Sequence, residues 1–320
     1  MAIFKLKPAL KDYLWGGTRL KEEYGKETDM DIVAESWELS THPDGPSVID
    51  SGPYKGVTLR DFIKINGTNC LGVEGKAFED FPVLIKFIDA KQPLSIQVHP
   101  DDEYAMIHEN EYGKTEMWFI LDAQPDSYLY FGTNRSLTKE EFRKHIENGT
   151  VLDVLKKVPV KKGEVFFIPA GTIHAIGPGI QICEIQQNSN STYRIYDYGR
   201  LGKDGKPREL HVDKAIDVAN LEPIDSDFQP CGPTVQYGDL SIMRMAYSKY
   251  FSTYVCVLMG STDFSIGFDS FGCLVVVDGH AELECQGQEI KAEKGDTVFI
   301  TANSRSIRIK GSARFIYTRV

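Results

Sequence analysis

Short runs of β-branched and aromatic residues, separated by glycine, proline, asparagine and aspartate, recur along most of this chain. Clear examples are FPVLIKFID (81–89), LSIQV (94–98), MWFIL (117–121) and EVFFI (164–168). Runs of this length and composition are typical of β-strands, and their close spacing is typical of an antiparallel sandwich or barrel. The sequence therefore predicts a mainly β protein.

One region, at about 136–158, has a helical pattern instead. Thr138 followed by Glu141 has the form of a capping box, in which each side chain caps a backbone N–H of the first helical turn. Gly149 then ends the helix, and a second short helix is expected to start at Thr150. We expect a small helical insertion between two sets of strands.

A chain of 320 residues exceeds the length at which a single hydrophobic core usually keeps growing, so two domains are expected. The best linker is PIDSDFQPCGPT, which is rich in proline, serine and aspartate. The predicted boundaries are 1–225 for a first domain that contains the helical insertion, 226–235 for the linker, and 236–320 for a second β domain.

A weak internal similarity crosses this linker. KKGEVFFIPAGTIHAI (161–176) can be aligned with EKGDTVFITANSRSIRI (293–309), which places His174 opposite Ser306. A short match of this kind can also arise by chance. If the two halves are copies of one barrel, the second copy has lost its histidine, and we expect it to be metal-free.

The overall charge disfavours some classes of partner. The formal net charge is -10, and no cluster of basic residues stands out, so we expect neither nucleic acid nor an anionic membrane surface as a partner. Lys5, Lys7 and Lys11 interrupt the start, where a secretory signal needs an unbroken apolar stretch. The six cysteines have no C-x-x-C spacing. We interpret them as free thiols and expect a cytoplasmic protein.

Gly163, Pro169, Gly171 and His174 form the pattern G-x5-P-x-G-x2-H. This pattern resembles the second sequence motif of the cupin superfamily, which implies double-stranded β-helix (jelly-roll) barrels. In this motif the histidine enters a strand after a turn and faces inward. A lone histidine after a turn is otherwise more often an ordinary surface or core residue.

Three further residues are candidate metal ligands. Gln97 and His99 lie two apart in a predicted strand, so both side chains leave the same face, about 7 Å apart along the strand. The polar outer face of an ordinary strand is the alternative. Glu116 heads an apolar run, where a buried carboxylate is costly without a cation. With His174, two imidazoles and two oxygen ligands suit Zn²⁺, Mn²⁺, Fe²⁺ or Co²⁺ without choosing among them.

Several segments together resemble the type I mannose-6-phosphate isomerase (phosphomannose isomerase) family in its shorter bacterial form. They are WGGTRL (15–20), AESWELSTHPDGPS (34–47), QPLSIQVHPDDEYA (92–105), GKTEMWFIL (113–121), IPAGTIHAIGPG (168–179), ICEIQQNSNSTYRIYDYGR (182–200) and RELHV (208–212). The resemblance covers about 1–215. It implies interconversion of mannose 6-phosphate and fructose 6-phosphate through a cis-enediol.

The resemblance also implies roles for individual residues. The metal, Zn²⁺ by this resemblance, would be held by Gln97, His99, Glu116 and His174. Catalysis would involve Arg194, Lys114 and Glu184, and substrate binding would involve Ser95, Arg200, Lys114 and Arg194. Arg200 stands where the family often has a lysine, which keeps the positive charge but changes its shape. Either Glu184 or Lys114 could be the base.

Two other functions stay open from the sequence. Cupin barrels host many reactions, so a dioxygenase, another sugar isomerase or an epimerase is possible. A regulatory protein that binds a sugar phosphate without catalysis is the alternative from a different class. The residue pattern does not specify an oligomeric state.

Overall fold

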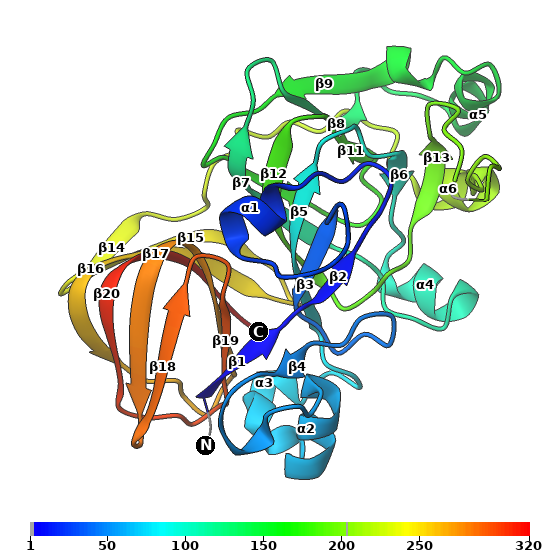
Figure 1. Cartoon of the computed structure of the whole chain (residues 1–320). Coiled ribbons are helices and arrows are strands. Elements are labelled where there is room, and N and C mark those ends of the chain that lie inside the picture. The colour runs from blue at the N-terminus through cyan, green and yellow to red at the C-terminus, as the bar shows by residue number, and fades with distance from the viewer. Residues whose placement is uncertain (1–2, 203) are drawn as a thin grey trace.

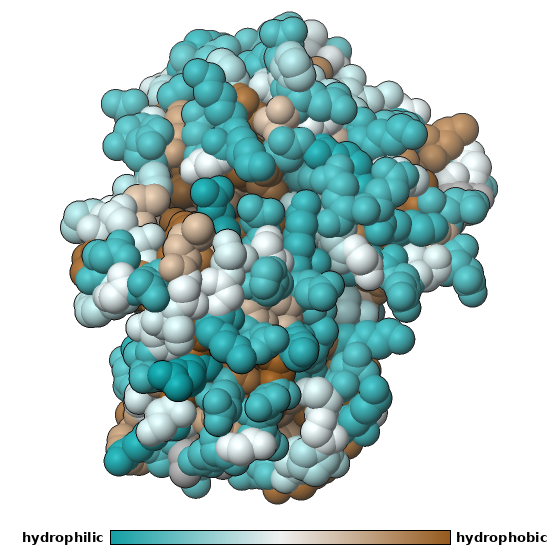
Figure 2. Space-filling view, turned by 60° about the vertical axis from the view of Figure 1, so that its left-hand side comes forward, coloured by the Kyte–Doolittle hydropathy of each residue, from teal (hydrophilic) through white to brown (hydrophobic). Residues whose placement is uncertain are grey.

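The computed structural model describes residues 3–202 and 204–320, and it confirms a mainly β protein. Figure 1 shows two β-rich parts side by side, with short helices around them. On the face shown in Figure 2, hydrophobic residues are visible only in small groups between polar ones. No helix in the described ranges has both the length and the apolar character needed to cross a membrane.

The N-terminal part contains two antiparallel sheets that share one core. The six-stranded sheet consists, in spatial order, of β10 (Val165–Ile168), β7 (Glu116–Ala123), β12 (Ile180–Gln187), β5 (Val83–Ala90), β3 (Glu35–Leu39) and β2 (Ala9–Lys11). The five-stranded sheet consists of β13 (Tyr193–Tyr196), β6 (Ile96–Val98), β11 (His174–Ile176), β8 (Tyr128–Thr133) and β9 (Leu155–Pro159). Ile120 and Ile182 from the first sheet pack in one cluster with Phe131 and Ile176 from the second. Two such sheets around one core are the arrangement of a jelly roll.

Helices cover the outside of the five-stranded sheet. Helix α5 (Lys139–Glu147) begins with the predicted capping box, in which Thr138 and Glu141 cap each other's backbone N–H groups. Its apolar face packs with α6 (Val212–Val218) in one cluster with the sheet. The second predicted helix is only a 3₁₀ turn, η3 (Val151–Val154). The chain then enters β9, which pairs with β8 and buries Leu155 and Val158.

The remaining helices are short and lie at the edges of the sheets. They are α1 (Arg19–Tyr24), η1 (Gly52–Tyr54), α2 (Leu59–Asn66), η2 (Thr68–Leu71), α3 (Gly72–Gly75) and α4 (Asp102–His108). The side chains of Thr58 and Asp101 cap the N-termini of α2 and α4, so both helices begin at residues typical of N-caps.

The third sheet has nine strands and contains the C-terminal part of the chain. Its order is β14 (Thr234–Tyr237), β15 (Leu240–Tyr247), β16 (Ser252–Phe264), β20 (Ile307–Arg319), β17 (Gly272–Cys285), β19 (Thr297–Ile300), β1 (Ile3–Lys7) and β4 (Val48–Ile49), with β18 (Gln288–Glu293) paired to β17. The start of the chain is thus paired into the C-terminal sheet, where Phe4 lies opposite Phe299. The domain boundary at 226–235 stays a prediction. The structure adds that the first strand of the chain, β1, belongs to the C-terminal sheet.

The two aligned segments have the same local structure. Gly163 and Gly295 have φ angles of 93° and 96°, and each precedes a short strand, β10 or β19. Glycine suits these turns because other residues rarely adopt positive φ. A second turn follows in both segments, after which His174 begins β11 and Ser306 directly precedes β20. The two segments are therefore similar in structure as well as in sequence.

An apolar core joins the outer face of the six-stranded sheet to the C-terminal sheet. Phe87 and Ile185 contribute from one side, and Phe271 and Phe299 from the other. The rings of Phe299 and Phe271 are stacked with their centroids 5.3 Å apart, and Phe299 also stacks on Phe4 at 5.5 Å. This shared core holds the two parts together.

The core at Phe299 gives a stability prediction. Phe299→Ala should lower the free energy of unfolding by about 3 to 5 kcal/mol, because it leaves a cavity among buried rings. Phe268→Ala is the matched control, since this ring is 60% exposed and its loss should cost under about 0.5 kcal/mol. Urea unfolding of both variants tests this, and equal midpoints would contradict it.

Candidate active site

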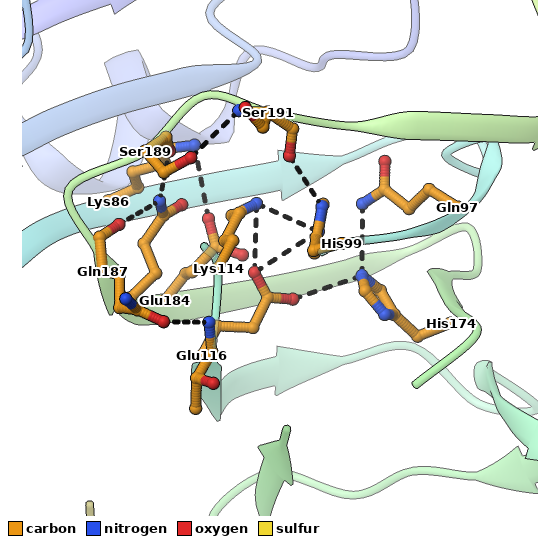
Figure 3. A network of polar contacts seen from close by, with 12 residues as sticks. Lys86, Gln97, His99, Lys114, Glu116, His174, Glu184, Gln187, Ser189 and Ser191 are labelled. Atoms are coloured by element: carbon orange, nitrogen blue, oxygen red, sulfur yellow. Dashed lines mark hydrogen bonds and ion pairs between the residues drawn. The ribbon is translucent and has the colours of Figure 1, made fainter. Parts of the chain in front are cut away.

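Three buried side chains converge between the two facing sheets (Figure 3). One nitrogen or oxygen atom of each of His99, Glu116 and His174 lies within 4.8 Å of the others. His174 begins β11 and lies opposite Gln97 of β6, while His99 directly follows β6. Glu116 begins β7 in the other sheet. The strand register therefore brings together residues that are distant in the sequence.

The two imidazoles are held in one orientation by backbone carbonyl groups. Nδ1 of His99 lies 2.9 Å from the carbonyl oxygen of Ser191, and Nδ1 of His174 lies 2.8 Å from that of Thr172. A carbonyl oxygen only accepts hydrogen bonds, so Nδ1 is the protonated nitrogen of each ring. The lone pair of each Nε2 therefore points to Glu116. Nε2 of His99 lies 3.6 Å from Oε2 of Glu116, and Nε2 of His174 lies 3.2 Å from Oε1.

The Glu116 carboxylate is fully buried; its Oε1 accepts no hydrogen bond from a described residue, and its Oε2 has the Lys114 ammonium as its ion-pair partner. Burial raises its pKa, which the nearby Lys114 ammonium opposes from 3.0 Å. Burial also lowers the pKa of His174 to about 4, so this ring stays neutral. A carboxylate facing two imidazole lone pairs is unfavourable unless a cation lies between them. These donors therefore fit a divalent metal ion.

Gln97 is close enough to be a fourth ligand. Its amide nitrogen lies 3.3 Å from Nε2 of His174. The nitrogen and oxygen of an amide exchange places by a half-turn of the terminal bond. That half-turn would direct Oε1 of Gln97 to the point where the two histidines and Glu116 meet.

A cavity of about 280 Å³ opens beside this cluster. Its polar lining includes Glu35, Lys86, Ser95, Gln97, Lys114, Glu184, Asn190, Arg194 and Arg208. The structure thus brings the predicted residues Ser95, Lys114, Glu184 and Arg194 to one hollow next to the predicted ligands. A cavity of this size, lined by groups of both charges, can hold a small polar molecule.

Glu184 lies in β12 with its carboxylate in a basic environment. The indole Nε1 of Trp118 donates to Oε1 at 2.9 Å, and Nζ of Lys86 lies 3.4 Å from Oε2. Burial would raise the pKa of Glu184, but Lys114, Lys86 and the Trp118 hydrogen bond together hold it well below its usual value. The carboxylate is therefore ionised. Lys86 itself is anchored between Glu184 and Glu35, whose Oε2 lies 3.5 Å from Nζ.

The predicted arginines differ in position. Arg194 lies opposite Gln97 across β13 and β6, so both side chains leave the same face of the sheet. Arg200 is not among the cavity residues and donates instead to the carbonyl oxygen of Pro93 at 2.6 Å. Arg208 lines the cavity and was missed, because it lies in the polar stretch GKDGKPRE, which resembles an ordinary surface turn.

Comparisons with known proteins agree with this site. Residues 3–132 match the family model "Phosphomannose isomerase type I, catalytic domain", and residues 241–320 match "Mannose-6-phosphate isomerase, cupin domain". The second match confirms the cupin fold class.

Similar proteins cover the chain from end to end. Mannose-6-phosphate isomerase ManA of Bacillus subtilis strain 168 is 38% identical over 318 residues, which cover 98% of each chain. The mannose-6-phosphate isomerase of Streptococcus mutans is 34% identical and covers 97% of this chain and 96% of its own. The crystal structure of the B. subtilis mannose 6-phosphate isomerase superposes with a TM-score of 0.92 at 33% identity, covering both chains fully. This chain therefore belongs to the type I mannose-6-phosphate isomerase family, which its sequence motifs predicted.

Proposed function

We propose that this chain is a metal-dependent aldose-ketose isomerase that interconverts mannose 6-phosphate and fructose 6-phosphate. Family members that match almost the whole chain are mannose-6-phosphate isomerases. The observation that carries the proposal is the buried Glu116 carboxylate, which faces two imidazole lone pairs beside a cavity that contains the ionised Glu184. A purely structural role would not explain a buried carboxylate whose Oε1 has no hydrogen-bond donor and faces an imidazole lone pair.

The proposed cofactor is one Zn²⁺ ion, held by His99, Glu116 and His174 with Gln97 as the fourth ligand. Two imidazoles, a carboxylate and an amide oxygen form a ligand set that suits this ion. When bound, a divalent cation supplies a Lewis acid that polarises substrate oxygens.

Isomerisation requires removal of a proton from one of two neighbouring carbons and its return to the other. We assign the base to Glu184, because its carboxylate is ionised at the cavity wall. The C–H electrons then form the C1–C2 double bond while the carbonyl electrons move onto the carbonyl oxygen, which gives an enediolate. A proton passes from the hydroxyl oxygen to that oxygen, the electrons left on the first oxygen form the new carbonyl, and the electrons of the C1–C2 double bond take the proton back from Glu184 at the adjacent carbon. Lys114, with its ammonium 3.0 Å from Glu116 and 3.2 Å from Nε2 of His99, stabilises negative charge on the enediol oxygens.

Ser95 and Arg194 are the proposed binding groups for the rest of the substrate. Both line the cavity on the side of the five-stranded sheet, where Arg194 is the cross-strand partner of Gln97. A hydroxyl and a guanidinium there can orient a sugar phosphate with its reacting carbons toward Glu184.

The chemistry is proposed to belong to the first domain, 1–225, with the helical insertion at about 136–158. The linker 226–235 then leads to a metal-free cupin-like domain, 236–320. Two observations support this division: Ser306 replaces His174 at the equivalent position, and within the described ranges the only cluster of three metal-binding side chains is His99, Glu116 and His174. A cytoplasmic location is also proposed, since the six cysteines are free, as in reducing compartments.

His174→Ala tests the metal site. The variant should bind far less than one metal ion per chain and lose turnover more than about 100-fold, because a ligand is gone. His280→Ala is the matched control, since His280 is exposed on β17. Metal analysis and a mannose 6-phosphate assay on one preparation test this. Full metal content and activity in His174→Ala would reject the assignment.

Glu184→Gln tests the base. The amide keeps the shape of the side chain but cannot take the proton, so kcat should fall about 10²- to 10⁴-fold while the metal stays bound. Exchange of the substrate C2 proton with deuterated water should fall in parallel. Glu164→Gln, outside the cavity, is the control. If Glu184→Gln keeps the exchange and Lys114→Met abolishes it, Lys114 is the base instead.

The histidine pKa gives a pH prediction for the chelated protein. The folded state keeps His174 neutral down to about pH 4, whereas a histidine in the unfolded chain takes up a proton near its ordinary pKa of about 6.5. The unfolded state therefore binds more protons between these values, and the free energy of unfolding should fall as the pH is lowered through this window. Urea unfolding at several pH values should show a weaker dependence in His174→Gln. An identical dependence would contradict the buried neutral histidine.

A further inference from the structure

Two arginines share the carboxylate of Asp197 at one end of the substrate cavity. The buried Asp197 accepts hydrogen bonds at Oδ1 from Nη2 of Arg200 and Nη2 of Arg208, both at 2.5 Å, and at Oδ2 from Nε of Arg208 at 2.7 Å. Arg194 lies nearby: burial lowers the pKa of its guanidinium, and the positive charge of Arg208 lowers it further. With one carboxylate against three guanidiniums, this end of the cavity has excess positive charge.

Arg208 combines a fixed position with free hydrogen-bond donors. Its Nε and Nη2 form a fork on the two oxygens of Asp197, which is the geometry of a bidentate arginine-carboxylate pair. Among the residues that the structure describes, no acceptor lies within hydrogen-bond distance of its Nη1. Because Arg208 also lines the cavity, the free donors are available to a ligand there.

Arg194, which also lines the cavity, has a free donor as well. Its Nη1 donates to the carbonyl oxygen of Glu209 at 3.0 Å, but its buried Nε has no hydrogen-bond partner among the described residues. A buried donor without a partner is costly, and an anion in the cavity would satisfy it.

Arg200 has a different environment. It donates from Nη1 to the carbonyl oxygen of Pro93 and from Nε to that of Asp197, in addition to its bond with the Asp197 carboxylate. These contacts connect the turn after β13 to the segment that leads into Ser95. Arg200 is not among the residues that line the cavity. Its contacts are those of a residue that holds the loop in place.

The distribution of charge in the cavity fixes the direction of a bound sugar phosphate. Glu184 and Glu35 line the cavity together with the two arginines, and Lys86 is already paired with both acids. A phosphate dianion is repelled by these carboxylates and attracted by Arg194 and Arg208. The end of the substrate that carries no phosphate is then left for Glu184.

We propose that Arg208 binds the substrate phosphate together with Arg194, that Asp197 is the positioning residue for Arg208, and that Arg200 holds the loop without contacting substrate. This inference rests on the proposed isomerase function, which it deepens by locating the phosphate. Arg200 stands where the family often has a lysine, and the phosphate-binding role falls instead to Arg208, further along the same loop.

The test compares Arg208→Gln with Arg200→Gln in the metal-loaded, full-length protein. Arg208→Gln should raise KM for mannose 6-phosphate about 10- to 100-fold and change kcat less than about threefold, because the phosphate contact is the same in the ground state and the transition state. Arg200→Gln should raise KM less than about threefold. Asp197→Asn should raise KM with little change in kcat, since Arg208 loses the fork that positions it.

Calorimetric binding of inorganic phosphate to the same variants gives a readout that does not need turnover. Affinity should fall about 10- to 100-fold in Arg208→Gln, and Arg208→Lys, which keeps the charge but not the fork, should be intermediate.

If the wild type binds phosphate through Arg208 but does not isomerise the sugar, the proposed function fails and the anion site stands. Unchanged KM and phosphate affinity in Arg208→Gln, or a larger effect in Arg200→Gln, would overturn the inference. Thermal melting and metal content establish folding, and Arg208→Lys decides the question if Arg208→Gln does not fold.

Discussion

The burial of the Glu116 carboxylate is the constraint on which the rest of the site depends. A carboxylate with no exposed surface is stable only beside positive charge, and here the nearest groups are the Lys114 ammonium and two imidazole lone pairs. Carbonyl groups of Ser191 and Thr172 hold the protons on the far side of both rings. The two imidazole nitrogens and the Glu116 carboxylate are thus already oriented to bind a cation before one is present.

The same low dielectric environment gives the two buried glutamates different properties. Burial dominates at Glu116 and raises its pKa, whereas Lys114, Lys86 and Trp118 outweigh burial at Glu184 and keep it ionised. Two neighbouring buried carboxylates can therefore serve different purposes, one as a metal ligand and the other as a base. The arginines complete the pattern, because they concentrate positive charge where a phosphate would lie and leave the reacting end to Glu184.

The sequence predicted local features well. A strand period of two predicted that Gln97 and His99 point the same way; Gln97 of β6 and His99, which directly follows β6, both lie beside His174, and the capping box at Thr138 was found as expected. The glycine and proline turn of the cupin motif likewise placed His174 at the start of β11.

Features that depend on pairing between distant segments were not predicted. β1 pairs with β19 across almost the whole chain, and nothing in IFKLK identifies that partner. Arg208 was missed for the same reason, since only the contact with Asp197 distinguishes it from other charges in a polar loop.

X-ray absorption at the edge of the metal in the purified protein shows whether one cation is held by histidine nitrogens and side-chain oxygens. We expect nitrogen and oxygen ligands at about 2.0–2.2 Å, with the outer-shell scattering of two imidazoles and no scattering from sulfur. A sulfur shell at about 2.3 Å, or a spectrum without imidazole scattering, would contradict this expectation.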